Sequence, residues 1–186
     1  MARKAERRAE WSEAAADYVL EHGLIGLSLR PLAADLGTSD RMLLYHFGSK
    51  DELVAAVLRT TNERSTEHVR TMEPSRDLRR AVHDLWAAML VPHIDRCSRL
   101  YVEAAALGLL GKEPYASVAR EANDLWTAAM VDHLVRSGVR RPLARRAVSV
   151  IDAAFMGFQL DLPLDVGTRE RNRAVADLAE AVEALA

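Results

Sequence analysis

Apolar residues recur at intervals of three and four along nearly the whole chain, and nowhere do they alternate with polar residues as a half-buried strand requires. Glycines and prolines interrupt this pattern where helices would end or begin, because glycine adopts the left-handed conformation of a helix end and proline suits a first turn. The segments between the interruptions have ordinary helix lengths. The pattern therefore predicts an all-α fold of about nine helices.

The first third of the chain is expected to form three helices, the last two of them short. A serine stands at the start of each short helix, where its hydroxyl can accept from a first-turn N–H, and a glycine ends each of the first two helices. The expected elements are a helix over 3–22 ended by Gly23, a helix capped by Ser28 with Pro31 in its first turn and Gly37 at its end, and a helix capped by Ser39 that runs to about Phe47.

The later helices are longer. Ser49 and Glu52 form a capping box that opens the fourth helix. The fifth lies between Pro74-Ser75 and about Pro92 and has an apolar stripe made of Val82, Leu85, Trp86, Met89 and Leu90. Further helices are expected over about 96–110, over about 114–137, from Pro142 to about 160, and from a cap at Thr168 to about 185.

The last two helices have surfaces that need a partner. The helix that begins at Pro142 is apolar nearly all round, as in a helix buried on two sides. The last helix has an apolar seam made of Val175, Leu178, Ala179, Val182 and Leu185. Together they fit a dimer interface to which each subunit contributes two helices, about 142–160 and 169–185. The alternative is one central helix buried within a monomer.

Composition and charge narrow the class of protein. Hydrophobic residues make up 49% and charged residues 28%, which allows a packed core and speaks against disorder. Cys97 is the only cysteine, so no disulfide can form within the chain, and no apolar run reaches membrane-spanning length. We expect a soluble, cytoplasmic protein. The net charge of −2, with seven basic and seven acidic residues among the first 50, argues against sequence-blind coating of nucleic acid.

The two short helices have the features of a helix-turn-helix. Ala33 lies one turn before Gly37, so the helices can approach closely and the chain can turn sharply between them. Leu32, Leu36 and Leu43 are expected to form the apolar wedge between them. The early residues of the second short helix would then face a DNA groove. A plain helical hairpin within a bundle is the alternative.

This region resembles the tetracycline-repressor (TetR) family of transcriptional regulators, almost continuously from about residue 13 to 58. The resemblance is carried by Glu21-His22-Gly23, Leu27-Ser28-Leu29-Arg30, Leu32-Ala33, Leu36-Gly37-Thr38-Ser39 and the run from Leu43 to Leu53. It implies a helix-turn-helix DNA-binding domain over 1–48, with the recognition helix over about 39–47, and a helical ligand-binding and dimerisation domain over 49–186. It also implies a dimer whose recognition helices enter successive major grooves of operator DNA.

The resemblance also implies which residues contact DNA. Arg30 falls where family members contact a base or a phosphate, and Lys50 matches a phosphate-contacting lysine at a helix start. The candidate DNA-binding residues are Arg30, Ser39, Asp40, Arg41, Met42, Tyr45, His46 and Lys50. Internal packing is an equal alternative for His46. The basic arm made of Arg3, Lys4, Arg7 and Arg8 is either a further DNA contact or a solvated tail.

Some of these positions depart from the family pattern. Asp40-Arg41-Met42 stands where many members have lysine or glutamine, a small residue and threonine. Leu44 stands where tyrosine is usual, so we expect Tyr45 to make that phosphate contact. Asp40 can accept from cytosine N4, and Met42 can lie against a thymine methyl group. These departures predict an operator particular to this protein.

Large side chains between residues 75 and 160 mix apolar bulk with a few polar ends, which suits a mostly apolar ligand pocket. Ordinary core packing is the alternative for each of them. The candidate ligand-binding residues are Trp86, Met89, His93, Tyr101, Trp126, Met130, Phe155, Phe158 and Gln159. The histidines are scattered over different helices, so neither a metal site nor a cofactor is expected.

These observations together predict a homodimeric repressor that leaves its operator DNA when a small, largely apolar effector binds. An enzyme is not expected, because the chain has no phosphate-binding glycine loop, no nucleophile motif and no metal-ligand spacing. The alternatives are a transcriptional activator with the same DNA-binding domain and a helical-bundle carrier or enzyme for small molecules.

Overall fold

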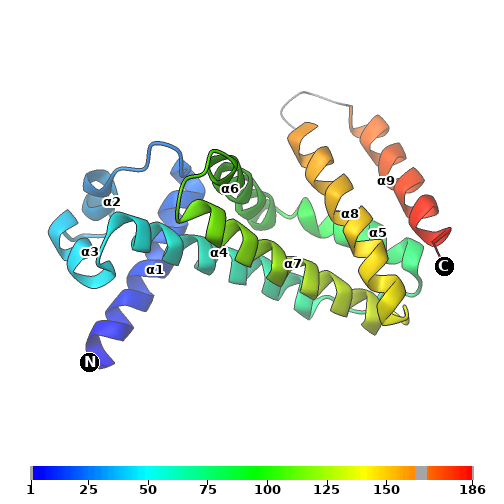
Figure 1. The fold of residues 1–186 in the computed structure, drawn as a ribbon, viewed down its shortest axis with the longest axis horizontal. Coiled ribbons are helices and arrows are strands. Elements are labelled where there is room, and N and C mark those ends of the chain that lie inside the picture. The colour runs from blue at the N-terminus through cyan, green and yellow to red at the C-terminus, as the bar shows by residue number, and fades with distance from the viewer. Residues whose placement is uncertain (1, 162–166, 186) are drawn as a thin grey trace. The chain divides into compact units, whose positions relative to one another are not determined.

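The computed structural model describes residues 2–161 and 167–185, and these form nine α-helices and no strand (Figure 1). The all-α prediction is confirmed. In chain order the helices are α1 (Ala2–His22), α2 (Leu29–Asp35), α3 (Asp40–Phe47), α4 (Lys50–Thr71), α5 (Leu78–Met89), α6 (Pro92–Leu109), α7 (Tyr115–Arg136), α8 (Arg141–Asp161) and α9 (Thr168–Glu183).

One predicted capping bond and two predicted helix starts are wrong in detail. Ser28 stands at the N-cap of α2 with extended backbone, but its side chain makes no capping hydrogen bond. Helix α6 begins at Pro92 rather than near residue 96, because proline is readily accommodated at a first helical position. Gly167 is the N-cap of α9, so Thr168 is the first residue of that helix and not its cap.

The chain divides into two compact units. The first comprises the residues up to Ser65 together with Pro92–Asp124, and the second comprises Thr66–Val91 together with the residues from Leu125 onward. Helices α4 and α7 therefore contribute their N-terminal parts to the first unit and their C-terminal parts to the second.

In the first unit, α1 packs against α2, α3 and α6. The core there is apolar, and its fully buried residues include Val19, Leu32, Leu43 and Leu53. These residues come from four different helices, so no pair of helices in this unit has a core of its own. Their burial is the main force that holds the unit together.

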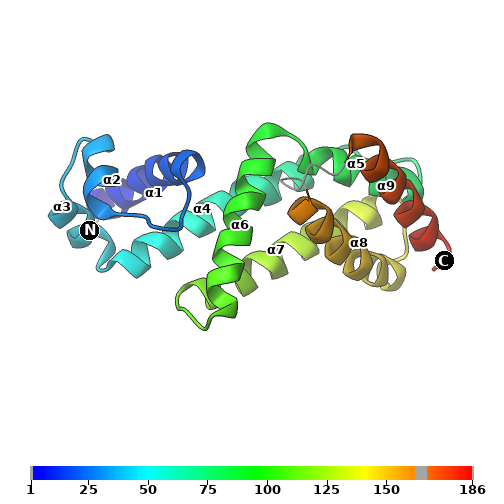
Figure 2. The same cartoon turned by 90° about the horizontal axis from the view of Figure 1, so that it is seen from above.

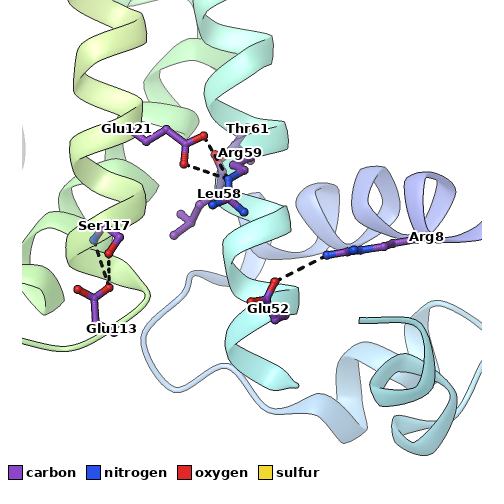
Figure 3. Close-up of polar contacts among 8 residues, drawn as sticks. All are labelled: Arg8, Glu52, Leu58, Arg59, Thr61, Glu113, Ser117 and Glu121. Atoms are coloured by element: carbon purple, nitrogen blue, oxygen red, sulfur yellow. Dashed lines mark hydrogen bonds and ion pairs between the residues drawn. The ribbon is translucent and has the colours of Figure 1, made fainter. Parts of the chain in front are cut away.

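Two charged contacts strengthen the first unit beside this core (Figure 3). The Arg59 guanidinium of α4 donates to the Glu121 carboxylate of α7, with 3.0 Å between Nε and Oε2. The Glu113 carboxylate accepts from the backbone N–H of Ser117 at 3.3 Å and from its hydroxyl at 2.6 Å, which caps the start of α7.

In the second unit, α5 packs along α9, and α9 lies beside α8 (Figures 1 and 2). The aromatic ring of Trp86 on α5 lies against two rings of α8, with centroid distances of 5.1 Å to Phe155 and 5.6 Å to Phe158. We call Trp86, Phe155 and Phe158 the aromatic cluster. Val175 and Val182 of α9 are buried in the same unit.

One face of α8 is exposed in the single chain. Val150 is 44% and Leu160 is 52% exposed, and Ala153 and Gly157 between them are exposed as well. Spacings of three and four residues place all four on one face, so the alternative of a helix buried within a monomer is wrong. Leu90 is also 45% exposed, because α5 ends before it. No helix in the described part of the chain is both long and apolar enough to cross a membrane.

A buried hydrogen-bonded group joins α5, α7 and the loop before α5. The Ser75 hydroxyl donates to the Asp84 carboxylate at 2.7 Å, and its oxygen lies 3.3 Å from Nε2 of the fully buried His133. Burial lowers the pKa of His133, the charge of Arg136 acts in the same direction, and Asp84 opposes them. The fold therefore favours the neutral imidazole.

We expect the protein to lose stability as the pH falls below about 6.5, the ordinary pKa of histidine. In that range the unfolded chain binds a proton at His133 that the folded chain does not bind, so protonation favours unfolding. Melting temperatures of the wild type and of His133→Gln should be compared between about pH 7.5 and about pH 5.5. The stability advantage of the wild type should shrink toward the acid end, and an advantage that does not change with pH would contradict this linkage.

Candidate nucleic-acid interface

Backbone hydrogen bonds close the turn between α2 and α3. The Thr38 N–H donates to the Ala33 carbonyl at 2.9 Å, and the Gly37 N–H donates to the Ala34 carbonyl at 3.2 Å. Gly37 has a φ of +64°, the left-handed conformation that the sequence predicted for this position. These bonds satisfy carbonyls that the end of α2 would otherwise leave open, and they determine the direction in which α3 leaves the turn.

Packing buries one side of α2 and one side of α3. Leu32 and Leu43 are fully buried, and Phe47 is nearly so. Leu36, the third residue of the predicted wedge, is only partly buried. Because Leu43 and Phe47 are one turn apart, they turn one face of α3 into the core and leave the opposite face to solvent.

The exposed face of α3 carries several of the predicted DNA-contacting residues. Tyr45 is 63% and Met42 is 41% exposed, and Arg41 is exposed beside them. Arg30 on α2 is exposed as well. Among the described residues, neither the Arg30 nor the Arg41 guanidinium has a hydrogen-bond or ion-pair partner. Both can therefore donate to an anion or to a base edge.

The start of α3 is capped as predicted. The Ser39 hydroxyl oxygen accepts from the Met42 N–H at 3.3 Å, and the Asp40 carboxylate accepts from the Arg41 N–H at 2.9 Å. Both side chains are exposed. Since a carboxylate offers about four acceptor positions, Asp40 can bond its own helix and still accept from an outside donor.

Tyr45 and His46 lie differently, although they are adjacent in the chain. The Lys4 ammonium of α1 lies 4.6 Å from the centre of the exposed Tyr45 ring. The His46 ring lies edge-on to Trp11, with 4.7 Å between ring centres, and its Nδ1 is buried with no hydrogen-bond partner. The structure therefore points Tyr45 outward and packs much of His46 against α1.

The basic residues near the N-terminus lie in α1 and not in a separate tail. The Arg7 guanidinium pairs with Glu10 at 3.2 Å. The Arg8 guanidinium lies 3.8 Å from the Glu52 carboxylate of α4 (Figure 3). The side chain of Arg3 lies outside the described part of the structure. Arg7 and Arg8 are thus paired with carboxylates, whereas Arg30 and Arg41 are not.

Lys50 opens α4 and is exposed. Its ammonium donates to the backbone carbonyl of Leu27 in the loop before α2. An ammonium has three donors, so this contact orients the side chain and leaves donors for an anion. Beside it, the Ser49 hydroxyl oxygen accepts from the Glu52 N–H at 3.1 Å, which is one of the two hydrogen bonds of the predicted capping box. The reciprocal bond from the Ser49 N–H to the Glu52 carboxylate is absent among the described residues, and that carboxylate lies 3.8 Å from Arg8 instead.

Sequence reasoning missed Glu103 of α6, which holds the loop between α1 and α2. Its Oε2 accepts from the backbone N–H groups of Leu24 and Ile25, both at 2.8 Å. Gly23 has a φ of +82°, and a Cβ there would lie 3.4 Å from this carboxylate. The partners are 79 and 78 residues apart, so no local pattern could reveal the contact.

The residues predicted to bind a ligand fall in both units. His93 and Tyr101 lie on α6 in the first unit. The members in the second unit are Trp86, Met89, Trp126, Met130, Phe155, Phe158 and Gln159. Within that unit the structure brings Trp86, Phe155 and Phe158 together as the aromatic cluster.

The other members in the second unit differ in burial. Met89 and Met130 are buried, and Trp126 is only partly buried. The indole N–H of Trp126 donates to the Asp152 carboxylate; burial raises the pKa of Asp152, and this hydrogen bond opposes the rise. In the described residues, no three His, Cys, Asp or Glu side chains gather as a metal site would require.

Comparison with known families identifies one segment. Residues 13–57 match the model of bacterial regulatory proteins of the tetR family. This segment includes all of α2 and α3 and parts of α1 and α4. No curated protein matches the chain.

Solved structures resemble the chain over nearly its full length. A transcriptional regulator from Rhodococcus sp. Rha1 has a TM-score of 0.75 at 22% identity, covering 94% of this chain and 95% of its own. A TetR transcription regulator from Haloarcula marismortui ATCC 43049 has a TM-score of 0.66 at 22% identity, covering 97% and 98%. The multidrug binding protein EbrR in complex with ethidium has a TM-score of 0.67 at 25% identity, covering 96% and 98%. The chain therefore has the fold of these regulators.

We expect Glu103→Ala to lower the free energy of unfolding by about 1–2 kcal/mol, because two backbone donors lose a charged acceptor. Hydrogen exchange at the Leu24 and Ile25 amides should become faster at the same time. Glu21→Ala is the matched control, since Glu21 is exposed on α1 and has no partner among the described residues. Equal effects of the two substitutions, measured by denaturant unfolding, would count against the role of Glu103.

Proposed function

By residues 13–57 the chain belongs to the tetR family of bacterial regulatory proteins, and on that premise we propose that it is a homodimeric transcriptional repressor that a small molecule releases from operator DNA. In this proposal residues 1–48 form the DNA-binding domain, and residues 49–186 bind the effector and form the dimer. The observation that carries the proposal is the exposed face of α3, where a methionine, a tyrosine and an arginine without a partner in the described part of the chain lie together.

The chemistry of that face supports base and phosphate contacts. The guanidinium of Arg41, and that of Arg30 on α2, can donate two parallel hydrogen bonds to guanine O6 and N7. Asp40 accepts from cytosine N4, and Met42 lies against a thymine methyl group. Tyr45 donates to a phosphate oxygen.

Other residues support the phosphate contacts around the helix. Lys50 offers its remaining ammonium donors to a phosphate at the start of α4, where the helix dipole also favours an anion. Ser39 holds the first turn of α3 in position. His46 contributes mainly by packing against Trp11, and its exposed edge is the part that faces DNA.

The exposed face of α8 supports the dimer. Val150, Ala153, Gly157 and Leu160 form an apolar stripe that one chain leaves open. A Cβ built at Gly157 meets nothing within 4 Å, so a second helix has room to approach closely there. A two-fold axis that pairs α8 and α9 with their copies would bury the stripe.

The aromatic cluster supports an effector site in the second unit. Flat rings around a few polar groups are typical of sites for small, largely apolar molecules. EbrR has been solved with imidazole and with ethidium. An effector releases the protein from DNA only if it binds one dimer conformation more tightly than the other. The favoured conformation must be one whose recognition helices do not match half-sites about 34 Å apart.

We expect Arg41→Ala to weaken binding to the operator by roughly tenfold to a hundredfold, because a bidentate base contact is lost. Lys50→Ala should weaken binding to specific and nonspecific DNA alike, as loss of a phosphate contact does. The operator is first recovered from genomic DNA with the purified wild-type protein. Arg140→Ala, an exposed arginine of the second unit, is the control.

If the wild-type protein binds DNA without sequence preference at moderate salt, the proposal that it is a transcriptional regulator is wrong. A reporter gene placed behind the recovered operator then distinguishes the two modes of regulation. Higher output in the absence of the protein is the result for a repressor, and lower output is the result for an activator.

We expect Leu160→Glu to separate the dimer, with a dissociation constant raised by a hundredfold or more, because an unpaired buried charge costs about 3–5 kcal/mol. Operator binding should fall with it. Leu109→Glu is the matched control, since Leu109 on α6 is 90% exposed. Analytical ultracentrifugation measures the mass of each variant. A dimer that survives Leu160→Glu would place the interface elsewhere.

A further inference from the structure

Two polar atoms in or beside the aromatic cluster are buried and have no hydrogen-bond partner within residues 2–161 and 167–185. They are the indole Nε1 of Trp86, a donor, and the side-chain Oε1 of Gln159, an acceptor. Trp86 is only 4% and Gln159 only 9% exposed. Buried polar atoms are nearly always paired, because leaving them unpaired costs free energy, so each exception calls for an explanation.

The two residues belong to the same part of the second unit. The Trp86 ring lies against Phe155 and Phe158. Gln159 directly follows Phe158 on α8 and lies one helical turn beyond Phe155. The unpaired donor on α5 and the unpaired acceptor on α8 therefore flank the same aromatic surface.

Some other polar groups of this unit do find partners. Trp126 donates its indole N–H to Asp152. Ser75 donates to Asp84 and contacts His133. Gln159 is the only glutamine of the whole chain, and methionine would fill its place with similar length and no polar group. The same unit also holds other buried atoms without a hydrogen-bond partner among the described residues, such as Oγ1 of Thr66 and Nδ1 of His133. Trp86 and Gln159 are distinguished by their place, because Trp86 belongs to the aromatic cluster and Gln159 is next to Phe158 in α8.

We propose that Trp86 and Gln159 form the polar end of the effector site, and that the effector is a flat, mostly apolar molecule with one hydrogen-bond acceptor and one donor at its edge. The acceptor of the effector accepts a hydrogen bond from the Trp86 N–H, and an N–H or O–H of the effector donates to the Gln159 oxygen. Cyclic aromatic amides and comparable heterocycles have this pair of groups. The proposal rests on the effector-binding role given above, and it excludes plain hydrocarbons as effectors.

The first test needs no effector. Gln159→Met should raise the melting temperature of the free protein by about 2–4 °C, because an unpaired polar atom is replaced by an apolar one of similar shape. Phe158→Leu, which removes apolar contacts from the cluster without touching a polar atom, should lower it. If Gln159→Met lowers the melting temperature, the oxygen is already satisfied within the protein and the proposal is wrong.

The second test uses two probes with the same double-ring frame. We choose 2-quinolone, which has an adjacent carbonyl and N–H, and naphthalene, which has neither. 2-Quinolone should stabilise the wild type against heat, and its affinity should fall about tenfold in Gln159→Met and in Trp86→Phe, since each loses one hydrogen bond. If naphthalene stabilises the wild type as much as 2-quinolone does, or if neither does, the assigned chemical class is wrong.

A DNA-binding measurement on the same proteins separates this proposal from the proposed function. If the protein prefers 2-quinolone but does not bind DNA specifically, the proposed regulatory function is wrong and the proposed effector site is supported. If the protein binds DNA specifically but does not distinguish the two probes, the proposed effector site is wrong and the proposed regulatory function is supported.

Discussion

The burial of Leu32 and Leu43 between α2 and α3, against α1 and α4, is the contact on which the exposed face of α3 depends. It turns one face of α3 inward and so decides which residues remain outside. The left-handed turn at Gly37 and the cap at Ser39 set the angle and the start of the helix, but neither would hold it without this apolar contact. Helices as short as α2 and α3 are not stable alone.

Charge acts here through local pairing and not through net charge. The chain is slightly acidic, and its first 50 residues are balanced. Two arginines of α1 are neutralised by Glu10 and Glu52, whereas Arg30 and Arg41 face solvent without a partner among the described residues. If this face binds DNA as proposed, its selectivity would come from the few unpaired side chains and not from a general attraction to polyanions.

The second unit leaves two kinds of group unsatisfied within one chain. The apolar face of α8, with Val150 and Leu160, is exposed to water, and the polar atoms of Trp86 and Gln159 are withheld from it. Each condition costs free energy in the isolated protomer. In the proposed homodimer a second copy of the chain would relieve the first cost, and an effector with matching polar groups would relieve the second.

The amino-acid sequence by itself determined the helices and most of their ends, because capping residues, glycine turns and apolar spacing act within a few residues of one another. Ser39 and Gly37 are examples, and so are the buried Leu32 and Leu43. Through the resemblance of residues 13–58 to one family, the sequence also indicated the exposed residues of α3 as candidate DNA contacts. The capping bond expected at Ser28 and the start expected for α6 were wrong, since several residues nearby can serve equally well.

Only the tertiary structure decided which side chains meet across long separations. The Glu103 bonds to the Leu24 and Ile25 amides, the Lys50 contact with Leu27 and the packing of His46 on Trp11 each depend on single side chains brought together by folding. The same holds for the atoms at Trp86 and Gln159 that folding leaves unpaired. Such contacts cannot be predicted from the periodicity of a sequence, because each depends on a single residue and not on a repeating pattern.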